Sequence, residues 1–220
     1  MEFGSAQAQS AFWEKRWSAA EHALFRAYAA RFDPAPDQIT EYLAARGVQS
    51  VCDAGCGCGA YALKLARLGF SVSGFDISAD AAVFAGALLA ENGCASGAFR
   101  VSDILSLPCP DGCFDAVVAR DVLDHMPLAD AVRALRELLR VTRRGGAAVL
   151  TLDRSDAEYE AEPHIVSPDG DYVYTGGKWA GMVFHPYTTA ALEALTQGLP
   201  YHILDAAGGF TVAVEKGSTQ

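Results

Sequence analysis

The chain has 220 residues, of which 51% are hydrophobic and 20% are charged, so it can build one sizeable α/β core. Its formal net charge is −10 with no block of basic residues, which argues against a nucleic acid or an anionic membrane as partner. The longest apolar stretch, Ala81–Ala90, has about half the length that a bilayer span needs. The composition therefore predicts one soluble domain and disfavours a nucleic acid partner.

The N-terminus shows no basic region followed by an apolar one, so we expect no secretion signal. We therefore expect a cytoplasmic location. Residues 1–5 resemble the remnant of a cloning vector, and residues 1–9 are expected to be disordered. The remainder, 10–220, is expected to form a single domain with an insertion on the substrate side at about 153–187. The sequence is compatible with a homodimer.

The cysteines do not show the paired C-x-x-C spacing of a structural zinc site. They are Cys52, Cys56, Cys58, Cys94, Cys109 and Cys113. Reduced thiols that serve as small apolar side chains are favoured over metal ligands or disulfides. We therefore expect no metal.

The pattern from the N-terminus onward predicts two helices and then alternating strands and helices. The first helix, 10–32, should end at Asp33-Pro34-Ala35-Pro36, and the second, 37–46, at Gly47. Strands are expected at 48–52, 70–75, 98–101, 114–119 and 147–152, and helices at 61–68, 79–91 and 128–141. This alternation is typical of a parallel sheet with helices on both faces.

The C-terminal part departs from that alternation. After a non-helical segment at 153–187, a helix is expected at 188–197 and two strands at 201–205 and 210–214. The short connection between these strands predicts a hairpin, so the final strand should enter the sheet antiparallel. No internal repeat or linker indicates a second domain.

A glycine-rich turn follows the first strand, in the sequence Val51-Cys-Asp53-Ala-Gly55-Cys-Gly57-Cys-Gly59. Glycines at alternate positions remove side chains where the backbone turns sharply, so a ligand can approach the main chain closely. Nicotinamide, flavin and nucleotide enzymes also use turns of this kind, and a tight turn that binds nothing is the alternative.

Two further acids come at the ends of the next two strands. Asp76 can accept hydrogen bonds from both ribose hydroxyls, and Asp103 can meet an exocyclic amine, with Ile104 beside it to cover a purine. Either acid alone could be a helix N-cap. Their order along strands that end at one sheet edge favours a ligand site at the switch point.

These motifs resemble those of the class I (Rossmann-like) S-adenosylmethionine-dependent methyltransferases that act on small molecules. Asp53 to Gly59 is similar to the family's D/E-x-G-x-G-x-G motif, and the segments around Asp76, Asp103 and 114–126 are similar to its second, third and fourth motifs. Arg140–Gly146 resembles the family's R-V-L-K-P-G-G turn, with Arg144 in place of the proline. The resemblance covers roughly residues 10–215.

The resemblance implies a doubly wound, seven-stranded, mostly parallel α/β sheet with a final antiparallel strand, and S-adenosyl-L-methionine as cofactor. It implies that Asp53 orients the glycine loop and that Asp76 holds the ribose. Asp103 would accept from the adenine amine, and the Arg120 backbone would lie beside the methionine amino group. The implied cofactor residues are Asp53, Gly55, Cys56, Gly57, Asp76, Ile77, Asp103, Ile104 and Arg120.

The sequence indicates the residues that would contact the methyl acceptor less clearly than those that would contact the cofactor. His125 follows the fourth strand and is the leading candidate for a general base, which is needed only if the acceptor carries a proton when it attacks. Second choices are Asp121, His164 and His185. The insertion supplies aromatic and polar side chains suited to a small, partly apolar ligand, so the candidate substrate residues are His164, Tyr174, Trp179 and His185. A lid or a dimer contact is the alternative for this insertion.

Trp13 and Trp17 stand at helical spacing. They either anchor the N-terminal helix to the core or fold over the cofactor, as such helices do in several small-molecule methyltransferases.

The predicted function is therefore methyl transfer from S-adenosylmethionine to a small-molecule acceptor. The absence of an N/D-P-P-Y/F sequence argues against the exocyclic-amine DNA and protein glutamine methyltransferases that the resemblance would otherwise admit. The alternatives are a non-catalytic module that binds the same cofactor and a nicotinamide-dependent oxidoreductase.

Overall fold

A seven-stranded sheet forms the centre of the computed structural model, which describes residues 6–18, 21–94 and 97–217. The strand order is β3-β2-β1-β4-β5-β10-β9, with all neighbours parallel up to β5 and β10 antiparallel to both β5 and β9. The strands are β1 (Ser50–Ala54), β2 (Ser71–Asp76), β3 (Phe99–Val101), β4 (Phe114–Arg120), β5 (Thr142–Asp153), β9 (Tyr201–Asp205) and β10 (Gly209–Glu215). The predicted sheet and its antiparallel final strand are confirmed.

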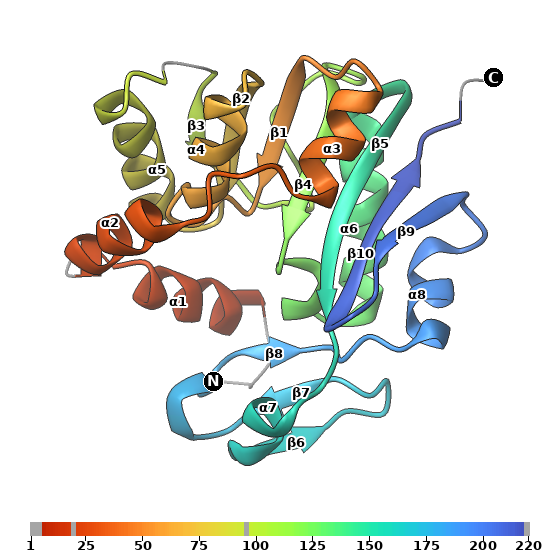
Figure 1. Cartoon of the computed structure of the whole chain (residues 1–220). Helices are drawn as coiled ribbons and strands as arrows, with labels where there is room; N and C mark the ends of the chain where they lie inside the picture. The colour runs from red at the N-terminus through yellow and green to blue at the C-terminus, as the bar shows by residue number, and fades with distance from the viewer. Residues whose placement is uncertain (1–5, 19–20, 95–96, 218–220) are drawn as a thin grey trace.

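Helices cover both faces of this sheet (Figure 1). On one face lie α3 (Gln38–Ala45), α4 (Ala60–Arg67) and α5 (Ala79–Glu91), and on the other lie α6 (Leu128–Val141) and α8 (Thr189–Thr196). Apolar residues recur along α6 at helical spacing, and its buried leucines all face the sheet. Each fully buried leucine or valine contributes about 1.5–3 kcal/mol by leaving water.

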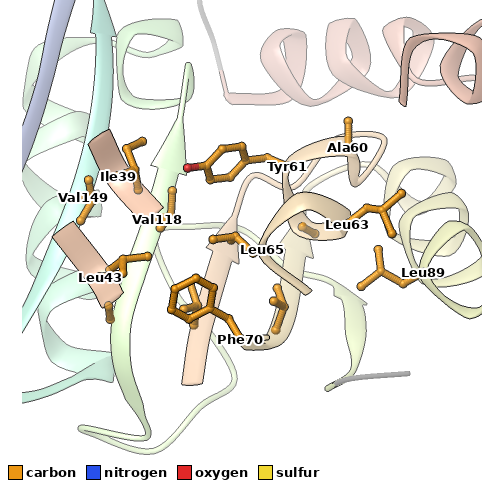
Figure 2. Close-up of a cluster of buried hydrophobic side chains, with 14 of the residues drawn as sticks. Ile39, Leu43, Ala60, Tyr61, Leu63, Leu65, Phe70, Leu89, Val118 and Val149 are labelled. Atoms are coloured by element: carbon orange, nitrogen blue, oxygen red, sulfur yellow. The ribbon is translucent and has the colours of Figure 1, made fainter. Parts of the chain in front are cut away.

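Two separate hydrophobic cores result, one on each face of the sheet. Figure 2 shows the first, where Ile39 and Leu43 of α3 and Leu65 of α4 pack over Val118 of β4 and Val149 of β5. Parallel strands buried on both faces need apolar side chains pointing both ways, which explains the continuous apolar run of β4 and β5.

The N-terminal region differs from the prediction of one helix over 10–32. The structure has two helices, α1 (Ala6–Arg16) and α2 (His22–Arg31), which are joined at one end (Figure 1). A single helix of that length would extend for about 35 Å and leave the domain. The break lets the Trp17 ring pack against Phe25, with centroids 5.1 Å apart. Helix α1 also includes residues 6–9, which were expected to be disordered, whereas residues 1–5 lie outside the described part.

The insertion, which was expected to be non-helical, differs from that expectation by one short helix. It contains the one-turn helix α7 (Ala157–Ala161) and a small antiparallel sheet of β6 (His164–Val166), β7 (Tyr172–Tyr174) and β8 (Val183–Phe184). The left-handed Gly177 (φ +68°) starts a 3-10 turn, η3 (Gly177–Trp179). Figure 1 shows this sheet and α1 beside the end of the main sheet where the parallel strands terminate.

Within the described ranges, no helix combines the length and the apolar character needed to cross a bilayer. All six cysteines are free thiols, and Cys52, Cys56 and Cys58 are buried.

Gly59 joins the glycine turn to α4 in the left-handed conformation (φ +75°). A Cβ there would lie 2.7 Å from the Cβ and 2.9 Å from the Cα of Ala85 in α5. Gly69 is also left-handed (φ +95°), but a Cβ there would meet nothing within 4 Å.

We expect Gly59→Ala to cost about 2–5 kcal/mol of unfolding free energy, because the backbone strain of about 1–2 kcal/mol adds to overpacking against α5. Gly69→Ala should cost only the strain. Urea unfolding of both variants measures the difference in unfolding free energy. Equal losses in the two variants would show that overpacking against α5 does not contribute to the cost of Gly59→Ala.

Candidate functional site

A cavity of about 400 Å³ lies at the carboxyl ends of β1, β2 and β4. This volume is in the range of small-molecule sites, about 300–1,000 Å³. The chain runs from β1 to β2 in one direction along the sheet and to β4 in the other, so the connections diverge and leave a crevice at this edge. The structure therefore forms a pocket where the motifs predicted one.

The glycine turn forms the floor of this cavity. The backbone N–H groups of Gly55 and Cys56 both donate to the carbonyl oxygen of Phe75, at 2.7 and 3.0 Å, which ties the turn to the end of β2. A Cβ on Gly55 would lie 2.4 Å from Cγ2 of Val122, so only glycine fits. The turn thus presents backbone rather than side chains to the cavity.

Asp76 links the turn to the start of α5. Its Oδ2 accepts from the Gly57 N–H at 2.8 Å, and its Oδ1 accepts from the Ser78 N–H at 2.9 Å. The side chain is buried, and burial raises the pKa of Asp76 while the two backbone donors oppose the shift. Each carboxylate oxygen has two lone pairs, so both can still accept from a ligand hydroxyl.

Asp53 and Arg120 form a second polar part of the cavity wall. Asp53 is 2% exposed, and its Oδ2 has no hydrogen-bond partner in the described part of the chain. Burial raises the pKa of Asp53 to about 7, and the charge of Arg120 opposes the shift. The Arg120 guanidinium lies over the Tyr61 ring at 4.4 Å and makes no ion pair among the described residues.

A buried carboxyl with one unpartnered oxygen, together with a guanidinium that makes no ion pair among the described residues, suits a ligand that carries both an ammonium and a carboxylate. The amino-acid end of S-adenosylmethionine has this character, so the residues present fit the implied cofactor.

All nine predicted cofactor residues line this one cavity: Asp53, Gly55, Cys56, Gly57, Asp76, Ile77, Asp103, Ile104 and Arg120. Asp103 is exposed, and its Oδ1 accepts from the Leu105 N–H at 2.9 Å, which holds the carboxylate at the end of β3. The individual contacts that the family resemblance implies for these residues stay predictions.

Helix α1 forms the wall that faces the glycine turn. A Cβ on Gly57 would lie 2.7 Å from the Trp17 ring, so this ring rests on the backbone of the turn. Glu14 accepts from the Ala79 N–H at 3.1 Å, and Trp13 packs on His125 with centroids 5.1 Å apart. Both tryptophans pack on hydrophobic clusters and also line the cavity, and a contact with the cofactor stays a prediction.

The acceptor end of the cavity is mostly aromatic and apolar. It is lined by Trp13, His125, Met126, Tyr159, Trp179 and Met182. Nδ1 of His125 is shielded from solvent without a partner among the described residues, and burial lowers the pKa of His125 to about 4, opposed by the charge of Asp121. The ring is therefore neutral at pH 7 and is a weaker base than an ordinary imidazole, and its role as a base stays a prediction.

Of the candidate substrate residues, only Trp179 lines the cavity. His164 stacks on Tyr172 with centroids 4.3 Å apart, and the fully buried Tyr174 donates to the Tyr159 carbonyl at 3.0 Å. His185 is buried, with Nδ1 2.8 Å from Oδ1 of Asp171. These three side chains make contacts within the insertion and do not line the cavity.

The structure adds cavity residues that the sequence did not indicate, among them Gln9, Tyr28, Tyr159 and Met182. Tyr159 stacks on Phe184 with centroids 3.9 Å apart and an interplanar angle of 7°. No periodicity or motif reveals these residues, because their position depends on how α1 and the insertion fold back on the sheet.

Known proteins are similar to the part of this chain that forms the floor of the cavity. Residues 51–146 match the family described as "Methyltransferase domain". Ajmaline N-methyltransferase from Rauvolfia serpentina is 31% identical over 121 residues, which cover 52% of this chain and 41% of the relative. Tocopherol O-methyltransferase from Arabidopsis thaliana is 33% identical over 114 residues, which cover 51% and 32% respectively. The chain thus matches less than half the length of these curated relatives.

Solved structures show the same fold. An S-adenosyl-L-methionine-dependent methyltransferase from Methanococcus maripaludis has a TM-score of 0.65 at 18% identity, covering 94% of this chain and 95% of that one. The [4+2]-cyclase SpnF is 28% identical with a TM-score of 0.55, covering 80% of this chain and 63% of that one. Residues 51–146 are thus similar to a methyltransferase domain, and the solved structures show that the chain has the class I methyltransferase fold.

The pKa of Asp53 predicts a pH effect on stability. In the folded chain the pKa of Asp53 is about 7, above the ordinary value of 3.8. As the pH rises, the unfolded chain therefore releases this proton at a lower pH than the folded chain does. The contribution of the neutral carboxyl is fully present below a pH of about 4 and is lost as the pH rises through about 7.

Between about pH 5 and about pH 8, the unfolding free energy of the wild type should therefore fall by about 2–3 kcal/mol relative to Asp53→Asn, which does not titrate. Urea unfolding at the two pH values measures this change. The exposed Asp169→Asn should follow the wild type, and parallel pH profiles of Asp53→Asn and the wild type would contradict the shifted pKa.

Proposed function

We propose that this chain is an S-adenosylmethionine-dependent methyltransferase that transfers a methyl group in line to a small-molecule acceptor. One observation carries the proposal. The cavity floor formed by the glycine turn, Asp53 and Asp76 lies within residues 51–146, which match the methyltransferase domain. Fold alone does not assign an activity, whereas this site combines backbone, carboxylate and guanidinium groups that suit one cofactor.

The residues of the floor would hold the cofactor as follows. Asp76 accepts from the ribose hydroxyls, Asp53 and Arg120 hold the amino-acid end, and the backbone of the glycine turn contacts the ligand directly. When bound, S-adenosylmethionine supplies an electrophilic methyl group on a positively charged sulfur. The buried carboxyl groups of Asp53 and Asp76 favour a cation in this position.

The protein's contribution to the transfer is positioning and exclusion of water. Trp13, Trp179 and Tyr159 enclose the acceptor end with flat apolar surfaces. They suit a partly apolar, planar acceptor of small size. His125 beside Trp13 is the proposed base for an acceptor that carries a proton, since its neutral ring has a free Nδ1 among the described residues.

The relatives support a small-molecule acceptor but differ in the atom they methylate. Their names specify an N-methyltransferase for ajmaline, an O-methyltransferase for tocopherol and a C-methyltransferase for a sterol. The segments that match therefore carry the cofactor site, and the acceptor is selected by α1 and the insertion. We further propose a cytoplasmic setting, in keeping with six free thiols, and no nucleic acid partner, in keeping with the net charge of −10.

The proposal is tested by incubating the protein with S-adenosylmethionine and a panel of phenols, amines and carboxylic acids. We expect release of S-adenosylhomocysteine that requires both the protein and one acceptor class, with one methylated product per molecule released. Binding of S-adenosylhomocysteine without turnover on any acceptor would favour a non-catalytic module or a reaction of another type, as the cyclase relative illustrates. Tight binding of NADH instead would point to an oxidoreductase.

Asp76→Ala should weaken binding of S-adenosylhomocysteine by about 1–3 kcal/mol, the scale of lost hydrogen bonds to a charged group. Titration calorimetry measures the change, with circular dichroism to confirm folding. Asp111→Asn, at an exposed carboxylate outside the cavity lining, is the control. Unchanged affinity in Asp76→Ala would remove Asp76 from the proposed ribose contact.

A further inference from the structure

Three carboxylates come together where β4 and β5 end. These two parallel strands are neighbours, with Arg120 paired to Thr151, so the residues that follow lie at one sheet edge. Asp121 and Asp124 come after β4, and Asp153 is the last residue of β5. One carboxylate oxygen from each of the three lies within 4.8 Å of the other two.

The side chain of Asp124 contributes a buried oxygen atom without a hydrogen-bond partner to this cluster. Its side chain is fully buried, and its Oδ2 accepts from the Asp153 N–H at 3.2 Å. Its Oδ1 is shielded from solvent and has no hydrogen-bond partner in the part of the chain that the structure describes. None of the three acids is paired with a lysine, arginine or histidine among the described residues. A buried carboxylate oxygen without donor or cation is costly, so this one points to a positively charged ligand.

We propose that Asp121, Asp124 and Asp153 bind a hard divalent cation beside the acceptor end of the cavity. The three ligands are all carboxylates, with no cysteine or histidine in the group, and such oxygen donors select Ca²⁺, Mg²⁺ or Mn²⁺ over zinc and copper. The spacing of the cysteines predicts no metal site, whereas the sequence signal for this cluster is an acid at the end of each of two adjacent parallel strands.

The separation of the oxygens is compatible with a single ion. Two oxygens on one ion are at most twice the ion–oxygen distance apart, which is about 4.2 Å for Mg²⁺ and about 4.6–5.2 Å for Ca²⁺. The three oxygens all lie within 4.8 Å of one another, which is within the reach of Ca²⁺. Ca²⁺ is therefore the first ion to test.

Neighbouring hydroxyl groups hold two of these carboxylates in place. Tyr159 donates to Oδ2 of Asp153 at 3.2 Å, and the Thr151 hydroxyl donates to Oδ1 of Asp121. Such outer hydrogen bonds orient ligands in metal sites. Three carboxylates leave part of the coordination sphere of a Ca²⁺ ion to water or to oxygens of the acceptor, because Ca²⁺ takes 6–8 oxygens. Since Asp121 lines the cavity, these open positions would face the acceptor.

Terbium luminescence tests the site, because Tb³⁺ has the size of Ca²⁺ and is excited through nearby aromatic rings. The full chain, without cofactor or acceptor, is titrated with Tb³⁺ and then with Ca²⁺ or Mg²⁺ as competitor. We expect saturation at one ion per chain and displacement by Ca²⁺. Tyr159→Phe should weaken Ca²⁺ binding, measured by calorimetry, by about tenfold, because it removes the hydrogen bond that orients Asp153.

Asp121→Asn is the decisive variant, because its side chain is exposed and asparagine tolerates the left-handed backbone of this position (φ +55°). It should weaken Ca²⁺ binding at least tenfold, and Asp124→Asn should abolish it. Asp130→Asn is the matched control: this acid also lines the cavity but is paired with Arg133. It should bind Ca²⁺ as the wild type does.

Three results would overturn the proposal: no saturable binding at millimolar Ca²⁺, Mg²⁺ or Mn²⁺, equal loss in Asp130→Asn, or full binding in Asp121→Asn. Asp124 would then be a neutral, protonated acid. The measurement involves neither cofactor nor methyl transfer, so its failure leaves the proposed function untouched, and failure of methyl transfer leaves the cation site untouched.

Discussion

The carboxylate of Asp76 is the interaction on which the functional end of the molecule depends. It accepts from the N–H of Gly57 in the turn after β1 and from the N–H of Ser78 at the start of α5. Two strand-to-helix connections, each with unsatisfied backbone donors, are thereby held by one side chain. A glycine-rich turn is intrinsically loose, because glycine has the widest backbone freedom. The buried acid gives the turn a fixed shape before any ligand arrives.

The central fold follows from the sequence because its signals are local. The limits of α5 at Ala79–Glu91, α6 at Leu128–Val141 and β9 at Tyr201–Asp205 agree with the predicted ranges. In α5, Ser78 caps the helix by accepting from the Ala81 N–H, and Asn92-Gly93 ends it. The glycine turn and the acids at the strand ends likewise predict the cofactor side of the cavity. These motifs stand at the carboxyl ends of the parallel strands, where the cavity lies.

The acceptor side could not be predicted in the same way. Whether His185 faces a ligand or Asp171 depends on the register of β7 against β8, which pairs Tyr172 with Phe184. The break between α1 and α2 accompanies packing of the Trp17 ring on Gly57, a contact between residues that are distant in the sequence. Asp124 and Asp153 meet only because β4 and β5 are neighbours in the sheet. In each case, long-range packing overrides the local pattern.

The aromatic residues that enclose the acceptor end belong to a hydrophobic cluster of their own. Tyr174, Met182 and Phe184 form its buried centre, with Phe12 and Trp13 of α1 packed against them, apart from the two cores of the main sheet. Replacements in this cluster therefore change the walls of the pocket without loosening the sheet or the turn beneath it. The chain thus has a region where new ligand preferences can arise, by natural divergence or by directed evolution, at little risk to the folded scaffold.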